Sequence, residues 1–306
     1  MKTFIWLVRR ELWENKSFWL VPVVLTVLLV LAYIAGIVFT WVHGIHVVIN
    51  GHPASSLATL AAAHPEDARQ GLFIFYVVLT SLFNVVLIFM MVRYLLGCLY
   101  DDRRDRSILF WRSLPVSDVA TALSKLAVVM VVAPLATFSC LLLAQLIGTG
   151  ALSAIATQSG VSATAVVWGQ SHLGGIWAFL IVGFLVQSLW YLPFYGWCMM
   201  ASAWARRAPF LWAAVPILVG GIVEGILFQS NHFFTMVGLH AASVVPGIGA
   251  NIKIGAADYV HLGNIGFSMH SLATMLDSAS MWIGVGFGIV FVAAAIAIRR
   301  WRAEDY

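Results

Sequence analysis

Long apolar runs set the strongest limit on how this chain can fold. The first run extends from about Phe18 to Thr40 and contains no charged side chain. A run of about 20 apolar residues is what an α-helix needs to cross a bilayer. Over the whole sequence 61% of residues are hydrophobic and 10% are charged, whereas a soluble domain has roughly 25% charged residues. The chain is therefore predicted to be an all-helical integral membrane protein.

Five further apolar runs have the length of a membrane span. We expect spans at about 71–91, 126–147, 176–204, 210–228 and 281–298. Pro193 is expected to kink the fourth span, and Ser117 with Asp118 is expected to cap the helix that leads into the third. The whole chain, 1–306, then forms a single membrane domain with six transmembrane helices.

Three stretches between or before the spans are not expected to cross the membrane. Residues 1–17 combine charges with tryptophans, which predicts an interfacial elbow helix. Residues 148–175 contain no Lys, Arg, Asp or Glu and are expected to form a loop on the membrane surface. The Gly-rich residues 229–280 are expected to form a broken outer-face segment of re-entrant or interfacial half-helices.

The distribution of lysine and arginine predicts the orientation. Basic residues lie in the amino-terminal segment, in residues 101–118, in the turn before the fifth span and after the sixth span, whereas the opposite connections carry only Arg69 and Lys253. By the positive-inside rule both termini and residues 101–118 are cytoplasmic. We therefore expect a multi-pass protein of the cytoplasmic, or inner, membrane.

Residues 101–118 form a dense charged block in a chain that is otherwise almost bare of charge. The block begins Asp-Asp-Arg-Arg-Asp-Arg and runs into an apolar cluster that contains Phe110 and Trp111. A solvated loop held inside by its positive charges would explain part of this pattern. The mixed signs and the adjacent aromatic residues are more typical of a protein contact. The predicted contact residues are Asp105, Arg106, Ser107, Ile108, Leu109, Trp111, Arg112 and Leu114, with Arg206 and Arg207 as a second contact.

The same block carries a resemblance to a known family. An Asp-Arg-Arg-Asp-Arg-Ser-Ile-Leu order at 102–109 is followed by Ser-Leu-Pro-Val-Ser at 113–117 and Leu-Ser-Lys at 123–125. This order resembles the segment between spans two and three of ABC-2 type transporter permeases, over about 25 residues. The family form is nearer Glu-Arg-Glu-x-Gly-Thr with a later Gly-Lys. This chain differs at Asp105, at Ser107, in lacking the glycine, and at Ser124.

The resemblance implies one half of an ABC exporter. In that family two permease subunits surround a central path, and each is seated on a separately encoded ATPase subunit. Residues from about Asp105 to Leu114 correspond to the coupling helix of the family. Spans two and five of the family line the dimer interface, which maps here to Asn84 and Glu224.

The sequence contains no nucleotide-binding motif of its own. There is no GxxxxGK[ST] loop, so any ATP-driven work requires another polypeptide that binds ATP and magnesium. The chain is accordingly not expected to be an enzyme or to hold a cofactor. The expected partners are the ATPase subunit, a second permease copy that makes a homodimer, and membrane lipid, with no nucleic acid.

Four polar side chains deep in the spans are predicted to line a substrate path or a dimer interface: Asn84, Gln187, Tyr191 and Glu224. A lone carboxylate inside a span costs at least about 2.5 kcal/mol, so Glu224 is expected to face a cavity, a subunit or headgroup water. The neighbouring glycines would permit a close helix approach. For Asn84, Gln187 and Tyr191, an interhelical hydrogen bond is the simpler interpretation.

Two other functions are compatible with the sequence. One is a secondary transporter that uses Glu224 for proton coupling. The other is a membrane-bound metal-handling protein or enzyme built on outer histidines such as His43 and His46, although no Cys, Asp or Glu completes a ligand set and no metal site is expected. The three cysteines, Cys98, Cys140 and Cys198, are ungrouped and are expected to be core residues. For the exporter, uncharged and aromatic-rich spans suggest a hydrophobic or amphipathic substrate, such as a peptide, an antimicrobial or a lipid-like molecule.

Overall fold

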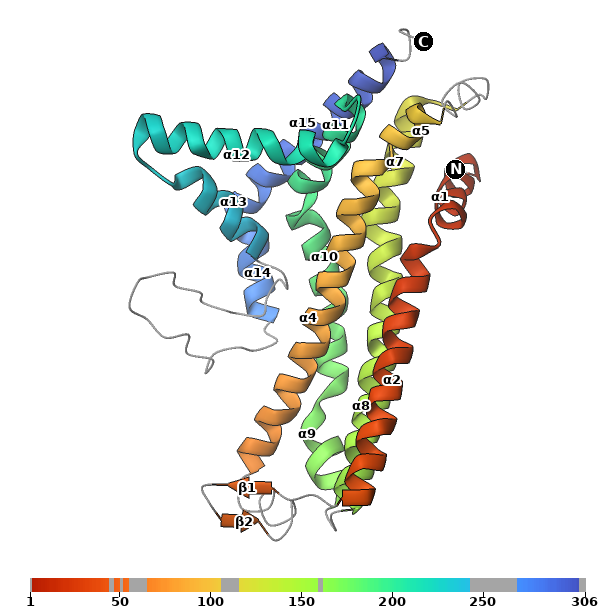
Figure 1. The fold of residues 1–306 in the computed structure, drawn as a ribbon, viewed down its shortest axis with the longest axis vertical. Helices are drawn as coiled ribbons and strands as arrows, with labels where there is room; N and C mark the ends of the chain where they lie inside the picture. The colour runs from red at the N-terminus through yellow and green to blue at the C-terminus, as the bar shows by residue number, and fades with distance from the viewer. Residues whose placement is uncertain are drawn as a thin grey trace. The chain divides into compact units, whose positions relative to one another are not determined.

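The structure is a computed structural model that describes residues 2–43, 47–49, 52–54, 65–105, 116–158, 162–242 and 269–302 (Figure 1). These residues are almost entirely helical. Six helical stretches among them are long and apolar enough to cross a membrane: Ser17–His43, Arg69–Arg104, Asp118–Gln158, Thr164–Trp190, Pro209–Phe228 and Ala279–Trp301. The prediction of an all-helical chain with six such helices is confirmed for the described residues, apart from one short hairpin.

The first half of the chain is built from long helices. It contains α1 (Lys2–Glu14), α2 (Ser17–His43), α4 (Pro65–Gly97), α5 (Tyr100–Arg104), α7 (Asp118–Ala127), the π-helix η1 (Val128–Val132) and α8 (Ala133–Gln158). Strands β1 (Val47–Ile49) and β2 (His52–Ala54) pair in antiparallel fashion, with Val47 opposite Ala54. This hairpin was not predicted from the sequence.

The second half is more interrupted. It contains the π-helix η2 (Thr164–Trp168), α9 (Gly169–Ser171), α10 (Leu173–Trp190), α11 (Leu192–Trp204), α12 (Pro209–Phe228), α13 (His232–Ala242), α14 (Met269–Asp277) and α15 (Ala279–Arg302). The predicted fourth span is thus divided at Tyr191, just before Pro193. Proline is tolerated in the first turn of α11, where its missing N–H is not needed.

One prediction about the fold was wrong. Residues 148–175 were expected to form a surface loop, but 148–158 continue α8 as far as Gln158, and η2, α9 and the start of α10 make 164–171 and 173–175 helical as well. Alanine is the best helix former and is frequent in this stretch. Gly148 also has a packing role, since an added Cβ would lie 2.5 Å from Cζ of Phe75.

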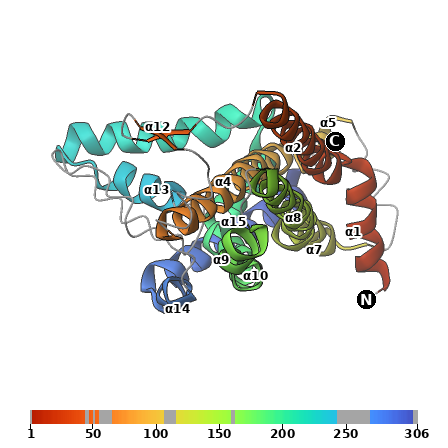
Figure 2. The same cartoon turned by 90° about the horizontal axis from the view of Figure 1, so that it is seen from below.

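The chain forms two compact units, and each is described by itself. One unit comprises residues 17–86 and 135–180. In it α2 and α8 run side by side (Figure 1, Figure 2). The core contains a buried polar chain, in which Trp177 Nε1 donates to Gln145 Oε1 at 3.0 Å and Gln145 Nε2 donates to Thr80 Oγ1 at 3.2 Å. The deep glutamine Gln145 therefore serves interhelical bonding.

The other unit comprises residues 1–16, 87–134 and 181–306. Helices α11 and α15 form its closest helix pair, because glycine removes side-chain bulk on both sides. A Cβ added at Gly196 would lie 2.6 Å from the Gly288 carbonyl oxygen, and one added at Gly288 would lie 2.8 Å from the Leu192 carbonyl carbon. Small residues at such crossings allow backbones to approach closely.

Helix α12 lies crosswise to α15 within this second unit (Figure 1, Figure 2). It begins at Pro209, directly after the turn that ends α11, and it contacts α13 through aromatic packing. A Cβ on Gly221 would overlap the ring of Phe234. The glycines around Glu224 therefore include at least one that makes room for a neighbouring helix of the same chain.

Candidate functional site

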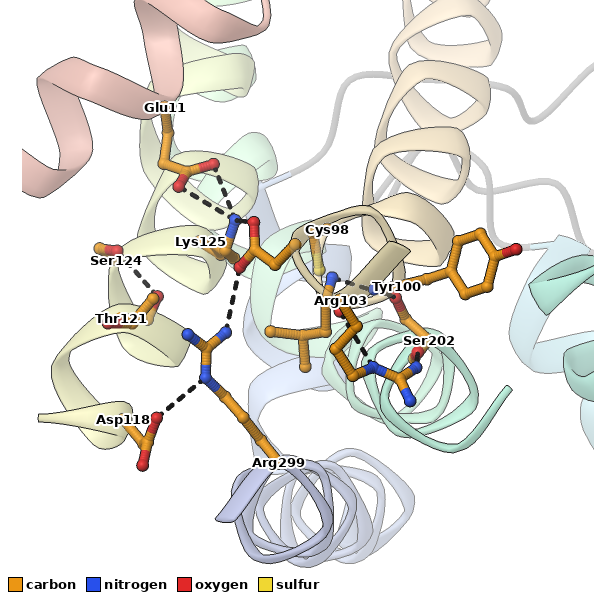
Figure 3. A network of polar contacts seen from close by, with 12 residues as sticks. Glu11, Cys98, Tyr100, Arg103, Asp118, Thr121, Ser124, Lys125, Ser202 and Arg299 are labelled. Carbon is orange, nitrogen blue, oxygen red and sulfur yellow. Dashed lines mark hydrogen bonds and ion pairs between the residues drawn. The ribbon is translucent and has the colours of Figure 1, made fainter. Parts of the chain in front are cut away.

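A buried network of ion pairs joins four helices of the second unit. Its charged residues come from α1, α5, α7 and α15, and they lie beside Cys98, which directly follows α4 (Figure 3). The members are Glu11, Asp102, Asp118, Lys125 and Arg299. Glu11 and Arg299 are far in the sequence from the members between 102 and 125, so only the fold brings these three parts of the chain together.

Lys125 is the centre of one half of the network. Its Nζ lies 3.0 Å from Glu11 Oε1 and 3.5 Å from Asp102 Oδ1. The side chains of Lys125 and Glu11 are only 3% and 2% exposed. The hydroxyl of Tyr94 donates to Glu11 Oε2 at 2.7 Å, which satisfies a second acceptor of this carboxylate.

Arg299 is the centre of the other half. Its Nη1 lies 3.1 Å from Asp102 Oδ2, and its Nε lies 3.0 Å from Asp118 Oδ1. Asp102 therefore bridges Lys125 and Arg299, and Arg299 ties α15 to α5 and to the start of α7. The side chain of Arg299 is 4% exposed.

The charges of the network are nearly balanced. Three carboxylates face two cations, and Arg10 at the rim adds a third cation 2.7 Å from Glu11. Arg10 also lies 3.2 Å from Glu14, where burial raises the pKa of the carboxyl and the nearby guanidinium opposes that rise. Removal of one partner from such a buried set leaves an uncompensated charge, which makes each member costly to lose.

A second polar contact fixes α5 against the end of α11 (Figure 3). The Ser202 hydroxyl accepts hydrogen bonds from the backbone N–H groups of Leu99 at 3.1 Å and Tyr100 at 3.0 Å. Arg103 Nη2 donates to the carbonyl oxygens of Ser202 at 2.6 Å and Ala205 at 3.0 Å. Ser202 lies in the last turn of α11 and Ala205 is the C-cap residue that follows it, and carbonyls at a helix end have no partner within the helix.

The predicted contact residues of the charged block lie mostly outside the described residues. These are Arg106, Ser107, Ile108, Leu109, Trp111, Arg112 and Leu114. Asp105 is described, and its Oδ1 accepts from Arg104 Nε at 3.0 Å. At the end of the block Ser117 caps α7 through a bond from the Ala120 N–H at 3.1 Å, as predicted.

The second predicted contact, Arg206 and Arg207, lies in the bend between α11 and α12. Both residues are exposed. The bond from Arg103 to the Ala205 carbonyl holds α5 beside this bend. Asp105 and the two arginines are thus attached to the same end of α11.

Three of the predicted interface or path residues are buried. Asn84 lies in α4, and Gln187 and Tyr191 lie at the α10–α11 break. Tyr191 donates from its hydroxyl to the Ala241 carbonyl at 3.0 Å. Its neighbour Trp190 and His240 bond reciprocally, with Trp190 Nε1 to His240 O at 2.9 Å and His240 Nε2 to Trp190 O at 2.7 Å. The break thus holds α13 in place.

Glu224 has a local role in the structure. Its Oε1 accepts from the Ser230 hydroxyl at 2.7 Å, and its Oε2 accepts from the Phe233 backbone N–H at 2.8 Å. The second bond satisfies an N–H group in the first turn of α13, as a capping side chain does. Its predicted place on a path or dimer interface stays a prediction.

The histidine pair does not form a described metal site. His43 Nδ1 lies 3.2 Å from the Phe39 carbonyl oxygen, and His46 lies outside the described residues. In the part of the chain that the structure describes, no group of three or more His, Cys, Asp or Glu side chains is arranged to hold a metal ion.

Sequence reasoning missed the ion-pair network altogether. Lys125 had a place only in the Leu-Ser-Lys motif, Arg299 only among the basic residues after the sixth span, and Glu11 had no predicted role. The only sequence signal was that Glu11 and Asp118 are acidic residues among the basic residues of the side predicted to be cytoplasmic. No family model, curated protein or solved structure matches the chain.

Proposed function

We propose that the chain is the membrane-spanning permease subunit of an ATP-driven ABC exporter of the ABC-2 type. The observation that carries the proposal is that both ends of the charged block belong to one buried network. Asp102 lies at the start of the block, Asp118 is its last residue, and Lys125 follows on the same helix as Asp118. A force applied to the block would therefore reach α1, α7 and α15 together.

This anchoring suits a segment that receives a mechanical displacement. A coupling helix must transmit the displacement of a partner subunit to the transmembrane helices. Flexible connections between the coupling helix and these helices would absorb that displacement. Ion pairs shielded from water are stronger than exposed ones, and several of them act here on short helices. The attachment of α5 to α11 through Ser202 and Arg103 adds a second stiff connection.

The remaining features of the proposal follow the family resemblance. Residues 1–17 form the elbow helix, both termini lie in the cytoplasm, and the protein resides in the inner membrane with a second copy of itself. A separate ATPase subunit contacts residues from Asp105 to Leu114 and the Arg206–Arg207 bend. Closure of the two ATPase subunits rocks the permease halves and moves a hydrophobic or amphipathic substrate.

Affinity purification of the chain from its native membrane tests the proposal. We expect an ATPase polypeptide in roughly equimolar amount and ATP hydrolysis in the purified complex. The variant that combines Asp105→Lys with Arg106→Glu should abolish the coupled hydrolysis while the permease stays folded.

A matched charge reversal separates docking from a general charge effect. Asp277 is exposed at the end of α14, and Asp277→Lys should leave the bound ATPase and its hydrolysis unchanged. Purification of the chain alone, under conditions that preserve known transporter complexes, would contradict the proposal. Unchanged coupling in the Asp105 and Arg106 variant would contradict the assigned contact.

A further inference from the structure

We propose that one face of α1 binds the phosphate headgroup of an anionic phospholipid through Arg9, held between the indole rings of Trp6 and Trp13. The guanidinium carbon of Arg9 lies 5.2 Å from the Trp6 ring centroid and 4.7 Å from the Trp13 ring centroid. The inference does not depend on the proposed transport function.

The two faces of α1 have opposite roles. Leu7 and Glu11, four residues apart, are buried on the face that joins the ion-pair network. Trp6, Arg9 and Trp13 follow a spacing of three and four residues on another face. Trp6 is 59% exposed and Trp13 is 61% exposed, which is unusual for the two largest apolar side chains on a short helix.

The position of α1 in the chain sets the depth of this face. Only Asn15 and Lys16 separate α1 from α2, the first helix that is apolar and long enough to span. The residues just before a span lie at the level of the lipid headgroups, where tryptophan is favoured. Ile5 is also exposed, so the face offers apolar side chains to the acyl boundary and a cation to the headgroups.

Arg9 is available to a phosphate in a way that Arg10 is not. Both carboxylates of α1 are engaged, Glu11 by Lys125 and Arg10, and Glu14 by Arg10. Within the described part of the chain, no carboxylate makes an ion pair with Arg9. Stacking on indoles uses the faces of a guanidinium and leaves its N–H edge free for the two oxygens of a phosphate.

Lipid retention by the full-length chain in detergent tests the site. Native mass spectrometry would compare the binding of dioleoyl phosphatidylglycerol with that of dioleoyl phosphatidylcholine. A basic residue near an anionic membrane surface corresponds to about a fivefold preference. We expect such a preference in the unmodified chain and its loss in the Arg9→Gln variant. The Arg9 side chain is exposed and lies outside the core, so this substitution should not disturb folding.

Two further variants distinguish the stacked site from charge alone. Lys16→Gln removes an exposed cation at the same end of the chain and should keep the preference. Arg9→Lys keeps the charge but loses the planar fork, and it should lose most of the preference. An equal loss in Lys16→Gln, or full retention in Arg9→Gln or Arg9→Lys, would overturn the proposal.

Inorganic phosphate distinguishes a lipid site from a site for free phosphate. Without the apolar contacts of an acyl chain, millimolar phosphate should not displace phosphatidylglycerol. Displacement at that concentration would assign the Arg9 site to a soluble anion and would overturn the lipid assignment.

Discussion

Lys125 of α7 and Glu11 of α1 form a direct ion pair, with Nζ 3.0 Å from Oε1, although 114 residues separate them in the chain. Both side chains are almost completely shielded from solvent. The pair is therefore a core contact and not a surface salt bridge. Loss of either residue is expected to lower the free energy of unfolding strongly, because the remaining charge would be buried without its partner.

The first prediction concerns loss of one charge from this pair. Lys125→Met leaves Glu11 and Asp102 without their shared cation, and we expect the free energy of unfolding to fall by about 3–5 kcal/mol. Thermal unfolding of the detergent-purified protein measures the change. The double variant Glu11→Gln with Lys125→Met should lose less than the sum of the single changes, because the two residues are coupled. Strict additivity would argue against the pair.

The second prediction concerns the Ser202 hydroxyl. Ser202→Ala leaves the N–H groups of Leu99 and Tyr100 without their acceptor, and it should cost about 1–3 kcal/mol. Hydrogen exchange at these two amides should become faster. The control is Ser139→Ala on α8, where an exposed hydroxyl donates only to the Leu135 carbonyl of its own helix. A change within about 0.5 kcal/mol is expected there; equal effects in both variants would refute the assigned role.

The third prediction compares two glycines of the same helix. Gly288→Ala places a methyl group 2.8 Å from the Leu192 backbone, so α11 and α15 must separate, at a cost of about 1–3 kcal/mol. Gly286 has open space around it, and Gly286→Ala should be neutral or stabilising by up to about 1 kcal/mol. Melting temperatures of the two variants give the comparison. An unchanged melting temperature in the Gly288→Ala variant would show that α11 and α15 do not approach each other this closely.

The fourth prediction concerns pH. Burial lowers the pKa of His240, against an opposing effect from its bond to the Trp190 carbonyl. A base whose pKa is lower in the folded state contributes full stability above its unfolded pKa, about 6.5. That contribution falls as the pH drops through this value, because the unfolded chain binds the proton more tightly. Hydrogen exchange in α13 should therefore speed up between about pH 7 and pH 5, and His240→Phe should remove the dependence.

Local chemistry made part of this structure predictable. The long apolar runs gave the six span-length helices, Ser117 was recognised as a cap from its position before Asp118, and Pro193 indicated the helix break that the structure has at Tyr191. Each of these inferences needs only neighbouring residues. The prediction of a loop at 148–158 was wrong because it depended on composition alone. A segment without charged residues can be a surface loop, but an alanine-rich helix has the same composition.

The site depended on contacts that no local pattern encodes. Asp102 and Arg299 are 197 residues apart, and Tyr94 is 83 residues from Glu11. A lysine or an arginine at the cytoplasmic end of a span satisfies the positive-inside rule whether or not it is buried, so Lys125 and Arg299 were indistinguishable from solvated charges. Only the packing of α1, α5, α7 and α15 shows which charges are shared.

The network also has a consequence for biosynthesis, because its members emerge from the ribosome in a fixed order. Glu11 is made first and meets Lys125 only after 114 further residues, and Asp118 meets Arg299 only when α15 has been made, 181 residues later. A nascent chain that has not yet produced α15 carries the Asp118 carboxylate without this arginine. Completion of α15 is thus the event that closes the network, and a chain stalled before α15 would hold both Asp102 and Asp118 without the arginine that pairs with them.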